Sequence, residues 1–149
     1  MADPTIHASA VLIGARAVLI QGPAGSGKSR LALALLQAAE AGALKFARLV
    51  GDDRVHVDES HGRLLVRPAA ALAGLIEVRG LGVRRVAFEA VAVAGLVVDL
   101  GVPEVTRLPE PASQEKVLAG VVLPRLAVAS GIDPFPMLLA RLRLPAAAA

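Results

Sequence analysis

The sequence predicts a single α/β domain over residues 1–149, with a strand-rich mixed sheet and few helices. Short apolar runs bounded by glycine, proline or aspartate recur along the chain, as they do in strands. One longer stretch, residues 29–41, is rich in Leu, Ala and Gln and is expected to be a helix that stops at Gly42. A chain of 149 residues fits one compact domain, which would bury roughly two thirds of its unfolded surface.

Strands are expected on both sides of this helix. Residues 11–13 and 17–20 indicate a hairpin whose second strand leads directly into a glycine-rich segment at Gly22. After the helix, a hairpin is expected to turn at Gly62, and another turn is expected at residues 80–82. The strands expected after the helix are residues 46–50, 54–58, 64–66, 75–79, 83–88 and 90–100.

The C-terminal third has a weaker pattern. A proline-containing loop is expected over residues 102–113, and from Lys116 onward the pattern fits strand and helix equally. Pro134 and Pro136 are expected to break this region before a short helix, because proline lacks a backbone donor. Residues 145–149 are expected to form a frayed tail.

Composition and charge exclude several classes of function. The absence of cysteine excludes disulfides, thiolate metal sites and cysteine nucleophiles. The chain is 55% hydrophobic but has no Trp or Tyr, which argues against an aromatic platform for single-stranded nucleic acid. The net charge of +3 is spread along the chain and favours acidic partners only weakly. We therefore expect no nucleic-acid partner.

A membrane location is not expected either. Uncharged runs such as residues 90–98 are far shorter than the ~20 residues that a membrane-spanning helix needs. Asp3 stands where a signal peptide would carry Lys or Arg. These features predict a cytoplasmic protein.

The glycine-rich segment matches the pattern GxxxxGK[ST] in full, with an apolar strand before it and a helix after it. Its glycines allow a curled backbone that directs N–H groups at phosphate oxygens, and the helix adds its positive end. Lys28 would contact the β and γ phosphates, and the Ser29 hydroxyl would ligate Mg²⁺. We predict that ATP phosphates bind to Gly22, Pro23, Ala24, Gly25, Ser26, Gly27, Lys28 and Ser29. The alternative is a chance match in a chain rich in Gly and Ala.

Phosphoryl transfer also requires carboxylates that hold the metal and orient the nucleophile. One apolar run leads to Asp52-Asp53, and another leads to Asp99. We favour the adjacent pair, because a metal or a proton would relieve a repulsion on the order of 1 kcal/mol or more. The alternative is a solvated turn in which Asp53 pairs with Arg54.

Glu77 and Arg79 alternate with apolar neighbours and would point to the same side of a strand. From this periodicity alone, the better interpretation is a surface ion pair that contributes little to stability.

Three motifs in order resemble the catalytic domain of the HPr kinase/phosphorylase family. That family has a glycine-rich phosphate loop, an Ala/Gly-Asp-Asp-Arg-Val segment and an Ile-Glu-Ile-Arg-Gly-Leu-Gly signature. Here they correspond to residues 22–29, 51–55 and 76–82, and the resemblance covers roughly residues 5 to 110. It implies a P-loop nucleotide-binding domain of the HPr kinase/PEP carboxykinase-like type.

The resemblance also implies roles for individual acids. Ser29, Asp53 and Glu77 would surround Mg²⁺, which replaces the surface interpretation of Glu77. Asp52 would be the general base that takes the proton from a protein serine. His7 matches a histidine that the family places near the active site, although a lone histidine is more often structural.

Arg79 and Arg107 would face the phosphates or the phosphorylated partner, a task that suits the planar guanidinium. In this family the substrate is HPr, the small phosphocarrier protein of the phosphotransferase system, modified on a regulatory serine. Some members also remove that phosphate by attack of inorganic phosphate, with release of pyrophosphate. The resemblance implies a homo-oligomer, a hexamer in the family.

The chain departs from the family pattern at three places. It resembles a short form without the long N-terminal domain, and Arg30 stands where an acid commonly follows Lys-Ser. The C-terminal Pro-Gly-Arg-Asn loop has no recognisable counterpart, and residues 120–125 are the nearest remnant. The reverse reaction and the assembly are therefore left open.

Other functions compete with this one. A small-molecule kinase would place its metal acid at Asp99. A nucleotide-binding sensor or scaffold without transfer activity would explain Arg30 and the short C-terminus, but it would not need all of Asp52, Asp53, Glu77 and Arg79. A nucleic-acid role would rest on Arg84-Arg85, which is more often a solvated face.

Overall fold

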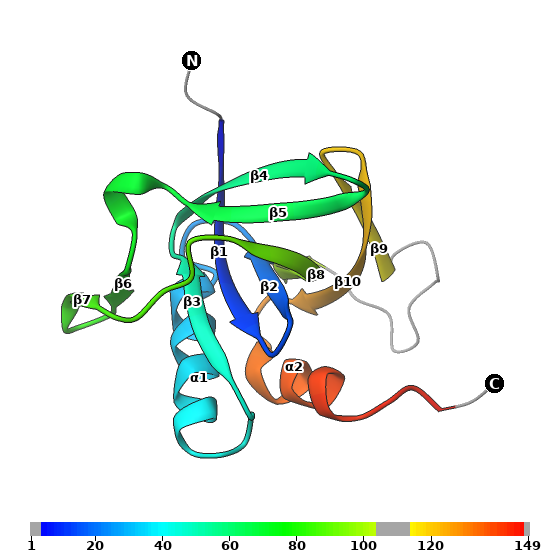
Figure 1. Ribbon diagram of the computed structural model, residues 1–149. Helices are drawn as coiled ribbons and strands as arrows, with labels where there is room; N and C mark the ends of the chain where they lie inside the picture. The colour runs from blue at the N-terminus through cyan, green and yellow to red at the C-terminus, as the bar shows by residue number, and fades with distance from the viewer. Residues whose placement is uncertain (1–3, 104–113, 148–149) are drawn as a thin grey trace.

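The computed structural model describes residues 4–103 and 114–147, and strands predominate among them (Figure 1). The helical elements are α1 (Lys28–Glu40), α2 (Pro134–Arg143) and the short 3₁₀ helix η1 (Ala70–Leu72). The strands are β1 (Thr5–Ile13), β2 (Arg16–Gln21), β3 (Ala47–Gly51), β4 (Arg54–Ser60), β5 (Arg63–Pro68), β6 (Leu75–Val78), β7 (Gly82–Arg85), β8 (Ala92–Val102), β9 (Glu115–Leu118) and β10 (Val121–Ala129). β8 runs parallel to β2 and β10 and antiparallel to β5, so the predicted strand-rich mixed sheet is confirmed.

Five strands of the large sheet pair in a closed ring. β2 pairs with β1, β1 with β4, β4 with β5, β5 with β8, and β8 again with β2. All five contribute to one buried cluster, in which alanine is frequent: Ala8, Ala10, Ala17, Ala92 and Ala94. Small side chains allow the strands of a narrow ring to approach one another, as in small barrels. The alanine-rich strands of the sequence are thereby explained.

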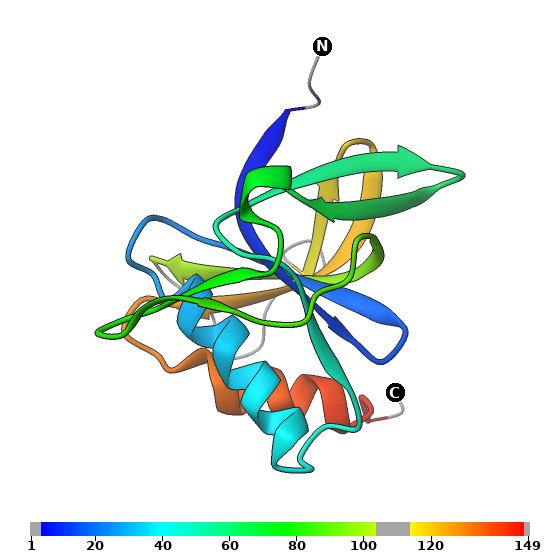
Figure 2. The same cartoon turned by 60° about the vertical axis from the view of Figure 1, so that its left-hand side comes forward.

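A second core lies between the sheet and the two helices, which cover the same face in both views (Figures 1 and 2). Leu31 and Leu35, one helical turn apart on α1, pack with Leu138 of α2 and with strand residues such as Ile20 and Val98. β2 and β8 are consequently buried on both faces, which explains their continuous apolar runs. This double burial fixes the point where β2 ends and the glycine-rich segment begins.

Several expected boundaries differ in the structure. The strand expected at residues 83–88 ends at Arg85, and β8 begins at Ala92 and extends through Val102. The ambiguous region after Lys116 forms the hairpin of β9 and β10, joined by Ala119 and Gly120, both with positive φ.

Helix α2 also begins earlier than expected. It starts at Pro134 rather than after Pro136, because Asp133 caps it by accepting the Phe135 N–H at 3.1 Å. Proline is compatible with the first turn of a helix, where its missing N–H has no partner to lose. Residues 145–147 are exposed without regular structure, and the rest of the expected tail lies outside the described residues. No helix in the described part of the chain is long and apolar enough to cross a membrane.

The predicted helix stop at Gly42 is confirmed. Gly42 has φ 83°, its N–H donates to Ala39 O at 3.1 Å, and the Ala43 N–H donates to Ala38 O at 2.8 Å. This pair of hydrogen bonds is the Schellman motif, which satisfies carbonyls at the helix end.

We expect Gly42→Ala to lower the free energy of unfolding by about 1 kcal/mol, because a Cβ disfavours this left-handed conformation. A Cβ at this position meets nothing within 4 Å, so steric overlap does not contribute. Urea denaturation measures the effect, and Gly42→Asn should lose less because Asn tolerates positive φ. Equal stability of the alanine variant and the parent would contradict the assignment.

Candidate active site

The glycine-rich segment forms a loop that joins β2 to α1. Lys28, the first residue of α1, is only 7% exposed, and its ammonium donates to the carbonyls of Gly22 at 3.0 Å and Pro23 at 3.3 Å. It has no carboxylate partner among the described residues. A buried ammonium with neutral partners only is a favourable position for an anionic ligand.

The backbone around this loop also suits an anion. Gly27 occupies the N-cap of α1 with φ 100° and offers no side-chain cap, and the first turn contains no acid. The N–H groups at the start of this helix therefore lack a side-chain acceptor, and the helix dipole makes this end positive. Gly25 has φ 80°, and a Cβ at either glycine would meet nothing within 4 Å, so the loop surface is open.

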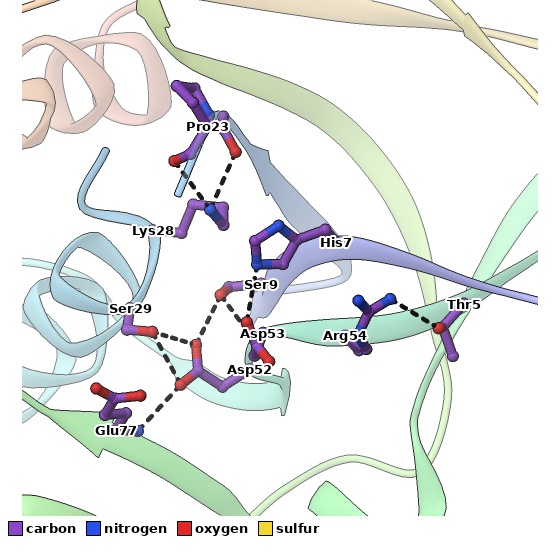
Figure 3. Close-up of polar contacts among 11 residues, drawn as sticks. Thr5, His7, Ser9, Pro23, Lys28, Ser29, Asp52, Asp53, Arg54 and Glu77 are labelled. Atoms are coloured by element: carbon purple, nitrogen blue, oxygen red, sulfur yellow. Dashed lines mark hydrogen bonds and ion pairs between the residues drawn. The ribbon is translucent and has the colours of Figure 1, made fainter. Parts of the chain in front are cut away.

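Asp52 is the centre of a buried hydrogen-bond network (Figure 3). The residue is 4% exposed. Its carboxylate accepts from Ser9 Oγ at 2.6 Å and from Ser29 Oγ at 2.7 and 2.9 Å. The backbone N–H of Glu77 donates to the same carboxylate at 3.0 Å. One carboxylate thus connects β1, the start of α1, and β6.

Asp53 points in a different direction from its neighbour. The chain makes a tight turn at Asp53, in which the Arg54 N–H donates to Asp52 O at 2.8 Å. Asp53 has a φ of 70°, a left-handed conformation that Asp adopts more readily than most residues. The Asp53 side chain is 61% exposed, and Oδ1 lies 2.8 Å from Nε2 of His7. The turn therefore leaves one aspartate buried and presents the other to solvent beside a histidine.

The remaining predicted residues are placed as follows. Glu77 lies on β6 with an exposed side chain near Ser29 and Asp52 (Figure 3). Arg79 follows β6, is exposed, and makes no hydrogen bond or ion pair with any other described residue. Arg107 lies outside the described residues. No group of three or more His, Asp or Glu side chains in the described chain could hold a metal unaided.

Ser9 is the residue that sequence reasoning missed. It is fully buried on β1, donates to Asp52, and its Oγ also accepts the Asp53 N–H at 3.3 Å. The available signal was weak, since a single serine among the apolar residues of β1 belongs to no motif. Only the pairing of β1 with both β3 and β4 brings it beneath the two aspartates.

Comparison with known proteins identifies the family of the chain. The family model for the HPr Serine kinase C-terminal domain matches residues 1–92, which include the loop, both aspartates and Glu77. The chain belongs to this family.

Curated relatives support the membership, and a solved structure shares the fold. HPr kinase/phosphorylase of Streptococcus thermophilus is 41% identical over 80 residues, and that of Clostridium beijerinckii is 36% identical over 81 residues. The aligned segments cover 53% and 54% of this chain but only 24% of each relative. The structure of the HPr(Ser) kinase/phosphatase from Coxiella burnetii matches with a TM-score of 0.74 at 23% identity, over 95% of this chain and 89% of that one. This last match shows the shared fold.

Asp99 lies beyond the part that matches the HPr kinase family. Lys116 Nζ contacts its two carboxylate oxygens at 2.9 and 3.1 Å, and Arg125 Nε contacts Oδ2 at 2.5 Å. These ion pairs attach the hairpin of β9 and β10 to β8. A carboxylate that already has two cationic partners is a poor metal ligand, which disfavours the alternative that places the metal acid at Asp99.

We expect Ser9→Ala to lower the free energy of unfolding by about 1–3 kcal/mol, because it removes one donor from buried Asp52 and the acceptor of the Asp53 N–H. Chemical denaturation measures the effect, and Ser60→Ala, which removes an exposed hydrogen bond to His61, is the control. The free energy of unfolding of this control should stay within about ±0.5 kcal/mol of the parent value. Similar effects of the two substitutions would contradict the role of Ser9.

Proposed function

We propose that this chain is an ATP-dependent protein-serine kinase that phosphorylates an HPr-type phosphocarrier protein of the phosphotransferase system. The observation that carries the proposal is the hydrogen bond from the Ser29 hydroxyl to Asp52, whose two carboxylate oxygens lie 2.7 and 2.9 Å from Ser29 Oγ. It joins the first turn after the glycine-rich loop to the two adjacent aspartates. Membership of the HPr kinase family supports the substrate class.

The loop would hold the nucleotide phosphates. Lys28 would exchange its two carbonyl partners for phosphate oxygens, and the uncapped N–H groups of α1 would donate to the same anion. The open surface at Gly25 and Gly27 leaves room for that approach. These residues fit a triphosphate, because they combine a buried cation, free donors and no acid.

Ser29 and Glu77 would hold Mg²⁺, and Asp52 would orient the Ser29 hydroxyl toward the ion. Magnesium in phosphotransferases usually takes one or two carboxylates and completes its coordination with substrate phosphates and water. The described chain fits this pattern, since it offers the exposed carboxylate of Glu77 and the Ser29 hydroxyl but no complete metal cage. When bound, the ion neutralises charge on the phosphates and aligns the transferred group.

Asp53 is better suited than Asp52 to the general base. The resemblance implies the opposite assignment, but Asp52 is buried and its carboxylate accepts from three donors, Ser9, Ser29 and the Glu77 N–H. Asp53 is exposed, so a protein serine can approach it, and His7 orients its carboxylate. We therefore assign the proton transfer to Asp53 and the ordering of Ser29 to Asp52.

The reaction that follows from this assignment is a direct transfer. Asp53 takes the proton of the partner's serine hydroxyl while that oxygen forms a bond to the γ-phosphorus of ATP. The bond between this phosphorus and the β,γ-bridging oxygen breaks, and ADP leaves with the electron pair. Lys28 and the helix end stabilise the charge on the phosphate oxygens. Arg79, exposed beside β6, would contact the incoming partner.

The phosphorylase direction, the hexameric assembly and a cytoplasmic location remain predictions from the sequence. The reverse reaction has little local support, since residues 120–125 form a hairpin turn and the first part of β10 rather than an open loop.

Transfer of γ-labelled phosphate from Mg-ATP to HPr from the same organism tests the proposed function. We expect the parent to label a serine, Lys28→Ala to lose the label, and Asp53→Asn to be slowed by at least ~100-fold, a typical contribution of a general base. Asp58→Asn, which removes an aspartate paired with Arg67 on the neighbouring strand, should leave the rate unchanged.

An inactive parent that still binds ATP through Lys28 would favour the sensor or scaffold. Full activity of Asp53→Asn with loss of activity in Asp52→Asn would restore the opposite assignment of the two aspartates.

A further inference from the structure

A cavity of about 320 Å³ adjoins the glycine-rich loop on the side away from the acids. One wall is formed by Pro23, Ala24, Gly25 and Ser26 of the loop, and the floor by Leu100 and Gly101 at the end of β8. The opposite wall is the end of β10 and the turn that follows it, residues 128–132. None of His7, Ser29, Asp52, Asp53 or Glu77 lines it.

The walls of this cavity are held together by the fold. The Ser130 N–H donates to Val102 O at 3.0 Å, which fixes the turn after β10 to the end of β8. Pro23 packs against Gly101, because a Cβ added to Gly101 would lie 3.1 Å from the proline ring. The cavity is therefore preformed, and its volume lies at the lower end of the ~300–1,000 Å³ typical of small-molecule sites.

The lining chemistry suits a neutral ligand. The side chains are aliphatic or small, no charged residue lines the cavity, and the hydroxyl of Ser26 is buried without a hydrogen-bond partner. Ile132 is 56% exposed on the turn, so its side chain is available to contact a ligand in the cavity. A flat ligand with an apolar face would cover Ile132, and its few polar groups could contact the backbone of the loop and of the turn.

We infer that this cavity receives the nucleoside, base and ribose, of the nucleotide whose phosphates bind the loop. The inference rests on the proposed function. Ser29, at the end of the loop, contacts Asp52, near which the γ-phosphate must react. The first half, Pro23 to Ser26, lines the cavity, so a nucleotide laid along the loop would place its uncharged end there.

The floor and far wall of this site lie outside residues 1–92, which match the family model. The C-terminal segment of this chain thus has a binding role of its own: Ile132 packs on the base, and the turn after β10 determines how tightly the nucleoside is held.

Calorimetric titration with ADP and with inorganic tripolyphosphate, both with Mg²⁺, separates the nucleoside from the phosphates. We expect Ile132→Ala to weaken ADP about tenfold through lost apolar contact and to leave tripolyphosphate affinity unchanged. Leu144→Ala removes a similarly exposed aliphatic side chain that lies outside the cavity, and it should change neither affinity.

Unchanged ADP affinity in Ile132→Ala, or an equal loss for both ligands, would overturn the inference while leaving the phosphate site intact. Parent protein that binds ADP no more tightly than inorganic pyrophosphate, which has the same number of phosphates, would overturn it as well. Lys28→Ala should weaken both ligands. If Lys28→Ala weakens the binding of neither ligand, the proposed phosphate site is wrong. This outcome differs from an Ile132→Ala variant that binds ADP like the parent, which would contradict only the nucleoside site.

Discussion

The arrangement of this site depends on the burial of Asp52. A carboxylate removed from water must be satisfied by donors, and here Ser9, Ser29 and the Glu77 backbone supply them. Because these donors come from β1, α1 and β6, one side chain fixes the relative positions of three elements. The tight turn that follows then presents Asp53 to solvent. The two adjacent aspartates therefore lie in different environments, one buried and one exposed, and can perform different functions in the reaction.

The ring of strands supports this network from below. β1 pairs with β2 before the glycine-rich loop, and it pairs with β3 and β4 on either side of the two aspartates. Gly51 is needed at that junction, because a Cβ there would meet Val55 at 2.6 Å and Pro68 at 3.3 Å. The loop and the aspartates are distant in the sequence, and their shared pairing with β1 brings them into contact. The small alanine side chains of the ring allow its strands to pair in a closed circle.

Much of this could be predicted from local sequence signals. The helix after the loop, its glycine stop, the hairpin at Gly62 and the mixed sheet all follow from periodicity and turn chemistry, and the structure confirms them. The pattern beyond Lys116 was ambiguous because its apolar residues suit either period, and only pairing with β8 selects strands. Ser9 and the ion pairs of Asp99 arise from contacts between distant segments, which no local pattern records. The separation of Asp52 from Asp53 depends on a positive φ angle that the sequence does not disclose.

The division of labour between the two aspartates is tested most directly by the Mg²⁺ dependence of ATP binding in Asp52→Asn and Asp53→Asn. If Asp52 orders Ser29 and contributes to the metal site, its amide variant should lose most of the gain in ATP affinity that Mg²⁺ confers on the parent. Asp53→Asn should keep that gain, because its side chain acts on the partner's serine. Loss of the Mg²⁺ effect in Asp53→Asn, with retention in Asp52→Asn, would contradict the account.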